Sequence, residues 1–86
     1  MTPPSIRFTY TNHARDMLLE REIAPEWVER TVLEPAATEP DPKHPERMRA
    51  FRAVPERDGR VLRVVYVPDG ETYRVITLFL DRGRRR

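Results

Sequence analysis

A histidine placed where a helix should begin is the residue of this chain best suited to chemistry. The segment HARDMLLEREI starts at His13, directly after Thr11 and Asn12, either of which can cap a helix. An imidazole in the first helical turn faces the positive end of the helix dipole, which favours its neutral form, and the free N–H groups there can hold a phosphate. His13 is therefore a candidate base or acid for phosphodiester chemistry. The structural alternative is a histidine that only hydrogen-bonds a nearby loop or carbonyl group.

Three further side chains could complete such a site. Arg21 follows His13 by eight residues, about 80° around an ideal helix, so the two side chains lean toward the same side. Tyr66 and Thr77 are the polar groups of the two most apolar segments, where they could donate a proton and orient a phosphate. The structural alternatives are a helix C-terminal cation, a core tyrosine and a strand-forming threonine.

Arginine recurs in the predicted strands of the second half. Arg47, Arg49 and Arg52 lead the first of these strands, and Arg63 and Arg74 interrupt the next two. Because side chains alternate along a strand, Arg47 and Arg49 share one face and Arg52 lies on the other. Arginines inside apolar strands must reach solvent, an acidic partner or an anion, since burying them unpaired is costly. Phosphate binding needs only one or two of them near His13.

Charge is unevenly distributed along the 86 residues. Residues 1–46 carry five Lys or Arg against nine Asp or Glu, a net charge of −4, whereas residues 47–86 carry eleven against five, a net charge of +6. Nearly all the cations are arginine, whose planar guanidinium suits phosphate. A genome rich in arginine codons explains the overall count but not the split.

Composition also restricts the class of protein. A chain this short forms one domain, residues 1–86. It has no cysteine, and the only other histidine, His44, stands in a proline-rich segment without ordered carboxylate spacing, so we expect no metal or cofactor and give His44 no role. No apolar run is long enough to span a bilayer and the N-terminus lacks signal-peptide features, so we expect a cytoplasmic protein without membrane contact.

The apolar pattern predicts a small α+β domain. Alternation favours a strand over residues 5–10, and helical periodicity favours one helix after Thr11 and another from Pro25 to Leu33. Residues 34–46, with four prolines, are predicted to be a loop. Antiparallel strands over 47–54, 61–67 and 72–80 follow, joined by turns at 58–59 and 68–70, and residues 81–86 form a basic tail.

The resulting order, β-α-α-β-β-β, predicts an antiparallel sheet of three to four strands with two helices packed on one face. The run VLRVVYV, residues 61–67, is nearly all apolar. A strand covered on both faces has this composition, so we expect it at the centre of the sheet.

Several motifs together resemble a bacterial family of unknown function. They are HARDMLLEREI, a proline after VLE, an arginine-led strand and a closing VITLF. That family carries His-Ala, a Met and Arg-Gly-Ile in its first helix and Ile-Thr-Val near its end, and the resemblance runs from about Ile6 to Leu80. The family is grouped with RelE-like and BrnT-like toxins, whose superfold includes barnase-like and colicin-type ribonucleases.

The resemblance implies a compact domain that cleaves RNA without a metal. A base would deprotonate the ribose 2′-hydroxyl, which attacks the adjacent phosphate, while cations stabilise the charge and an acid protonates the leaving oxygen. On the matching positions, His13 would be the base or acid and Thr77 would complete the pocket. The phosphate ligands would be Arg21 and one of Arg47, Arg49 or Arg52. We add Tyr66 to the catalytic candidates.

Two positions depart from the family pattern. Glu22 stands where the family commonly has glycine, so the first helix either ends without a left-handed residue or accepts a strain of about 1 kcal/mol. Met17 stands where an arginine is frequent, which removes one candidate phosphate ligand.

Three functional hypotheses follow. The leading one is a metal-independent ribonuclease of toxin type that acts on RNA and is held by an acidic antitoxin protein. The second is a non-catalytic module that binds RNA or a protein and in which His13 is structural. The third is a homodimer formed through the apolar closing strand RVITLFL, residues 74–80, which would be hazardous as an exposed edge.

Overall fold

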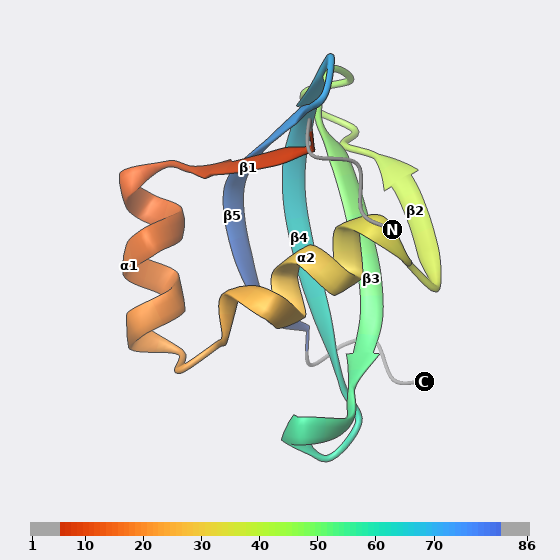
Figure 1. Cartoon of the computed structure of the whole chain (residues 1–86). Helices are drawn as coiled ribbons and strands as arrows, with labels where there is room; N and C mark the ends of the chain where they lie inside the picture. The colour runs from red at the N-terminus through yellow and green to blue at the C-terminus, as the bar shows by residue number, and fades with distance from the viewer. Residues whose placement is uncertain (1–5, 82–86) are drawn as a thin grey trace.

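The computed structural model describes residues 6–81, which form two α-helices, a short 3-10 helix and a five-stranded sheet (Figure 1). The elements in chain order are β1 (Arg7–Tyr10), α1 (Asn12–Glu20), α2 (Pro25–Leu33), β2 (Ala37–Pro40), β3 (Met48–Val54), η1 (Pro55–Arg57), β4 (Arg60–Asp69) and β5 (Thr72–Asp81). The predicted α+β class and the antiparallel meander of the second half are confirmed.

The strands lie in the order β1-β5-β4-β3-β2. β1 runs parallel to β5, and the other neighbouring strands are antiparallel. β4 is central, as its apolar composition predicted, and most of its side chains between Val61 and Tyr66 are buried. β5 is an inner strand, because β1 pairs with its first residues, 72–75, and α1 packs beside it. β1 thus covers the edge of this strand at residues 72–75, and the homodimer through residues 74–80 stays a prediction.

The prediction that residues 34–46 form only a loop is wrong for Ala37–Pro40, which pair with β3 as the edge strand β2. The sheet consequently has five strands rather than three or four. An edge strand tolerates proline because only one of its sides joins the ladder, and Pro40 occupies the last position of β2. Strand pairing is a contact with residues 48–51, which local composition does not reveal.

A side-chain turn organises the rest of that segment. The Oδ1 atom of Asp41 accepts hydrogen bonds from the backbone N–H groups of Lys43, at 2.8 Å, and His44, at 3.2 Å. These bonds lower the pKa of the Asp41 carboxyl group below its usual value. The connection between β2 and β3 is therefore an ordered hairpin rather than an extended loop.

The start of α1 is fixed by Thr11, which is the cap among the two candidates, Thr11 and Asn12, that the sequence offered. Its hydroxyl oxygen accepts a hydrogen bond from the backbone N–H of Ala14 at 3.1 Å and donates one to the carbonyl oxygen of Ile76 at 2.9 Å. Its own backbone N–H donates to the carbonyl oxygen of Val75 at 3.1 Å. One residue therefore both caps the helix and attaches it to β5.

The end of α1 depends on a left-handed residue. Glu22 has a φ of +53°, and the N–H of Ile23 donates to the carbonyl oxygen of Leu18 at 2.9 Å. The N–H of Glu22 donates to the carbonyl oxygen of Leu19 at 3.3 Å, which completes a Schellman motif. Of the two alternatives that Glu22 posed, the structure takes the strained one.

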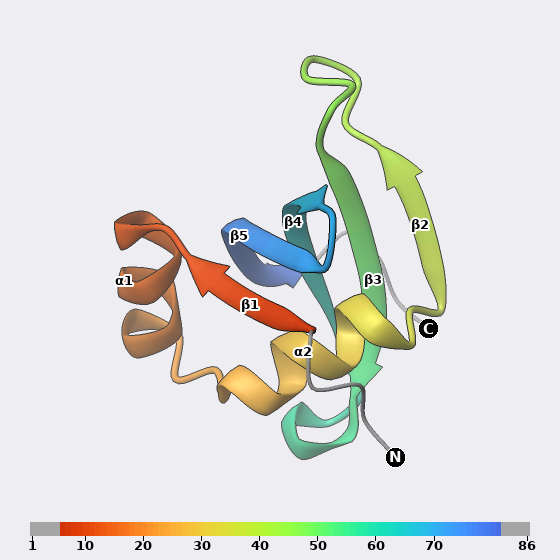
Figure 2. The ribbon, with the colours of Figure 1, turned by 45° about the horizontal axis from the view of Figure 1, so that its top comes forward.

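The helices occupy different positions around the sheet. α2, with the predicted bounds and Pro25 at its start, lies across β3 and β4, whereas α1 packs against β5 (Figures 1 and 2). The buried residues of the main core are Ala14, Ile23, Val28, Val32, Ala50, Val54, Leu62, Val64, Tyr66, Val75 and Leu78. Neither α-helix within residues 6–81 has the length and apolar character of a membrane span.

The face of the sheet turned away from α2 is called the open face below. Phe51, Arg63 and Phe79 form a row across it, because Phe51 pairs with Arg63 and Arg63 with Phe79. Asp81, predicted as the first residue of the basic tail, is instead the last residue of β5 and pairs with Val61. The other tail residues, 82–86, lie outside the described part of the chain.

Candidate functional site

His13 and Thr77 meet at the margin between α1 and the open face. The Nε2 atom of His13 lies 3.0 Å from the Oγ1 atom of Thr77, within hydrogen-bonding distance. His13 is the second residue of α1 and is exposed. It follows closely after Thr11, the residue that attaches the helix to β5. The contact holds the imidazole ring in one orientation and leaves Nδ1 as the nitrogen available to a ligand.

A β-bulge explains why Thr77 is on the same side as His13. Val65 pairs with Thr77 and Tyr66 pairs with Val75, so Ile76 is an extra residue in β5. Without it, Val75 and Thr77 would lie on the same face, because side chains alternate with a period of two. With it, Val75 is in the main core and Thr77 is on the open face.

An open groove extends from this pair along α1 toward the turn between β3 and β4. Its walls combine cations, carboxylates and apolar side chains. The lining residues are His13, Met17, Glu20, Arg21, Glu22, Arg57, Arg60, Thr77, Phe79 and Leu80. The lining holds three guanidinium groups, one imidazole and two carboxylates, a formal excess of one positive charge with the imidazole neutral, which suits an anionic ligand.

Arg57 lines the groove and fixes the end of α1. Its Nη1 atom donates to the carbonyl oxygen of Arg21 at 3.1 Å and to that of Glu22 at 3.2 Å. The residue is the last of η1, and the left-handed pair Asp58 and Gly59, with φ of +58° and +74°, turns the chain back from there into β4. Carbonyl groups at a helix C-terminus need such donors.

Sequence reasoning missed Arg57 and Arg60 as members of the site. The predicted turn at Asp58-Gly59 is present between them, so a hairpin end carrying two arginines could be foreseen. The contact of this hairpin end with the end of α1 could not be foreseen. It joins Arg57 to Arg21 and Glu22, which precede it by 36 and 35 positions in the sequence. The structure thus brings together His13, Thr77 and Arg21 of the predicted set and adds these two arginines.

Tyr66 lies on the other side of the sheet from His13. It belongs to the main core, at 8% exposure, and its ring packs edge-to-face on Tyr73 with centroids 5.6 Å apart. Burial, reinforced by Tyr73, raises the pKa of the Tyr66 hydroxyl group. The sheet therefore separates this hydroxyl group from the groove.

Arg47, Arg49 and Arg52, which lie in β3 or directly before it, are also outside the groove. Each contacts an oxygen atom of a different residue. Arg52 donates to the carbonyl oxygen of Glu34, beside α2. The Nε atom of Arg49 is 3.7 Å from an Asp41 carboxylate oxygen, and that of Arg47 is 3.9 Å from a carboxylate oxygen of Glu46. Alternation correctly predicted that Arg49 and Arg52 occupy opposite faces.

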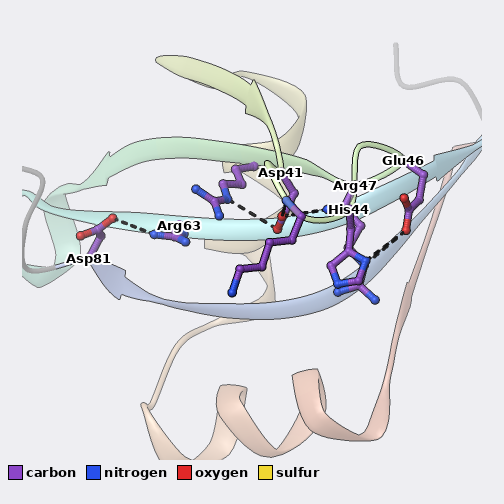
Figure 3. A network of polar contacts seen from close by, with 8 residues as sticks. Asp41, His44, Glu46, Arg47, Arg63 and Asp81 are labelled. Carbon is purple, nitrogen blue, oxygen red and sulfur yellow. Dashed lines mark hydrogen bonds and ion pairs between the residues drawn. The ribbon is translucent and has the colours of Figure 1, made fainter.

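Arg63 occupies the centre of the open face. Its guanidinium carbon lies 4.9 Å from the ring centroid of Phe79 and 6.0 Å from that of Phe51, and its Nη1 atom is 3.5 Å from Asp81 Oδ2. Figure 3 shows Arg63 and Asp81 pointing toward one another at one end of the network and His44 facing Glu46 at the other. The prediction that Arg63 needs an acidic partner, solvent or an anion is met by Asp81.

Within residues 6–81 we find no group of three or more histidine, cysteine, aspartate or glutamate side chains arranged to hold a metal ion. His44 and Glu46 form a pair at 3.8 Å, Nδ1 to Oε2, with both side chains largely exposed.

Comparison with known proteins gives one match. A protein-family model described as a domain of unknown function, DUF4258, matches residues 10–80. This range includes α1, α2, the groove and all of the strands apart from most of β1 and the last residue of β5. No curated protein and no solved structure matches the chain.

Proposed function

The chain belongs to the DUF4258 family, a domain of unknown function, and from the groove at the end of β5 we propose that it is a metal-independent ribonuclease of the RelE-like toxin type. The observation that carries the proposal is the exposed His13 imidazole, held by Thr77 in a groove lined by three arginines. These groups match the needs of phosphodiester cleavage, which are a general base and cations for the phosphate.

His13 is the base in this account. When Nε2 carries the proton and its N–H donates a hydrogen bond to Thr77 Oγ1, the lone pair of Nδ1 is free to accept the proton of a ribose 2′-hydroxyl. The 2′-oxygen then attacks the adjacent phosphorus, the bond from phosphorus to the 5′-oxygen breaks, and the 5′-oxygen takes a proton. The products are a 2′,3′-cyclic phosphate and a 5′-hydroxyl end.

The leaving oxygen takes its proton from water or from the His13 imidazolium that the first step creates. We drop Tyr66 from this role, because the sheet lies between its hydroxyl group and the groove. A raised pKa would also make that hydroxyl group a poorer acid.

The phosphate is held by Arg21, Arg57 and Arg60. The transition state carries extra negative charge on the phosphate oxygens, and guanidinium groups stabilise it through charge-assisted hydrogen bonds. Arg47, Arg49 and Arg52 are outside the groove, so we replace them in this role by Arg57 and Arg60.

A non-catalytic module that binds RNA or a protein is the second candidate. The same contact between His13 and Thr77 favours it, because a hydrogen bond joining α1 to β5 also suits a histidine whose only role is structural. An acidic antitoxin would fit either candidate, since its carboxylates would pair with the groove arginines.

Product analysis separates the two candidates. Purified protein is incubated with RNA in excess chelator, and the new ends are identified. A ribonuclease of the proposed kind yields 2′,3′-cyclic phosphate ends and leaves DNA of the same sequence intact. Intact RNA under conditions in which the protein binds it would support the binding module instead.

A further inference from the structure

We propose that Phe79 is the wall on which the groove stacks one unpaired base, so that the ligand is single-stranded RNA. This inference rests on the proposed function, since it specifies the substrate class of the same groove. Among the described residues that line the groove, Phe79 is the only phenylalanine, tyrosine or tryptophan. No step of the proposed cleavage uses it.

The position of Phe79 relative to His13 suits one nucleotide. Thr77 and Phe79 are two residues apart beyond the bulge and lie on the same face of β5, so they are about 7 Å apart along the strand. Thr77 holds His13 at 3.0 Å. A phosphate beside His13 would therefore place a neighbouring base within reach of the Phe79 ring.

The Phe79 ring is held in place by Arg63 of the neighbouring strand, β4. The Arg63 guanidinium carbon lies 4.9 Å from the Phe79 centroid, and Asp81 fixes that guanidinium through the 3.5 Å contact of Figure 3. The Arg63 side chain is 24% exposed and that of Asp81 16%, so both groups are largely covered. A ring fixed in this way loses little conformational entropy when a base stacks on it.

Stacking on Phe79 selects single strands over duplexes. In a double helix each base is already stacked between its neighbours, whereas an unpaired base can present its face to a protein ring. Because every base has such a face, this contact tolerates sequence changes. The groove arginines add attraction to the phosphates that flank the base.

The test is fluorescence anisotropy with a short labelled RNA of mixed sequence, either alone or annealed to its complement, with its 2′-hydroxyl groups methylated so that the proposed reaction cannot cleave it. We expect the wild-type protein to prefer the single strand. Phe79→Leu, which keeps an apolar side chain but removes the ring, should weaken single-strand binding about tenfold and leave duplex binding unchanged. Phe8→Leu removes a ring that packs against Tyr73, outside the groove, and should leave both affinities unchanged.

Phe79→Trp keeps the protein testable if the leucine variant does not fold, because a larger ring should retain or increase single-strand affinity. Equal affinity of wild type and Phe79→Leu, or equal affinity for single strand and duplex, would overturn the inference. Binding of a labelled polyglutamate peptide with no binding of RNA would overturn it as well, because that result would indicate a protein ligand.

The His13→Ala variant separates this inference from the proposed function. It should lose cleavage and keep single-strand binding that depends on Phe79. If wild type binds single strands through Phe79 and cleaves none, the nuclease mechanism fails and the stacking site stands. If wild type cleaves RNA and Phe79→Leu binds it equally well, the stacking site fails and the nuclease stands.

Discussion

His13 and Thr77 are 64 residues apart in the sequence, and their side chains meet at 3.0 Å between Nε2 and Oγ1. This contact links α1 to the far end of the chain and orients the imidazole ring over the groove. It arises from two backbone features: the attachment of Thr11 to β5 and the bulge at Ile76. The predictions below test the groups that hold the groove in this form.

Thr77→Val should slow RNA cleavage about threefold to tenfold, because it removes one hydrogen bond and leaves the shape of the side chain unchanged. The change should fall on kcat rather than KM, since Thr77 orients His13 and is not the phosphate ligand. Single-turnover and steady-state assays give both constants. Thr77→Ser, which keeps the hydroxyl group, should restore the rate. Loss of stability with unchanged cleavage would assign the contact a structural role only.

Glu22→Gly should raise the free energy of unfolding by about 1 kcal/mol, because glycine adopts the observed φ of +53° without steric strain. Urea denaturation measures the difference. Glu22→Ala is the matched control, since it removes the same charge and keeps the strain. Equal stabilisation by both variants would show that the carboxylate, rather than the backbone conformation, is unfavourable.

Arg57→Met should lower the free energy of unfolding by about 1–2 kcal/mol, because it keeps the apolar stem and removes the donor to the Arg21 and Glu22 carbonyl groups. Hydrogen exchange should accelerate at the backbone N–H of Ile23, which closes the last turn of α1. Arg60→Met serves as the control on the same hairpin. Unchanged exchange at Ile23 would contradict the role of Arg57.

The Asp41 carboxyl group should titrate below about 3.9, the usual value for aspartate, since the bonds from Lys43 and His44 lower its pKa. A lowered folded-state pKa stabilises the fold above the ordinary value, and this contribution is lost as the pH falls through the folded value. The amide signals of Lys43 and His44 should follow the same titration by NMR. Asp41→Asn keeps an acceptor and should remove the pH dependence. Titration at the ordinary value would refute this account of the turn.

Features that depend only on residues close together in the sequence could be predicted. The cap at Thr11, the helix from Pro25 to Leu33 and the central position of β4 follow from capping chemistry and apolar periodicity, which are local. The strand β2 could not be predicted, because prolines dominate its surroundings and its pairing with β3 is a tertiary contact. The parallel pairing of β1 with β5 is a contact of the same kind.

The candidate site divides in the same way. Helical geometry predicted that His13 and Arg21 lean toward the same side, and both residues line the groove. Strand alternation alone would put Thr77 on the face of Val75, in the core, and only the bulge at Ile76 reverses this. Arg57 joins the site through backbone carbonyl groups, which carry no sequence signal.

The most direct test of the central claim is RNA cleavage by the wild-type protein and His13→Ala in excess chelator, at equal concentration and with matched circular dichroism spectra. Arg15→Ala, on an exposed position of α1 outside the groove, is the control. The account predicts cyclic phosphate products from wild type and Arg15→Ala and none from His13→Ala. Equal cleavage by all three proteins, or by none of them, would contradict it.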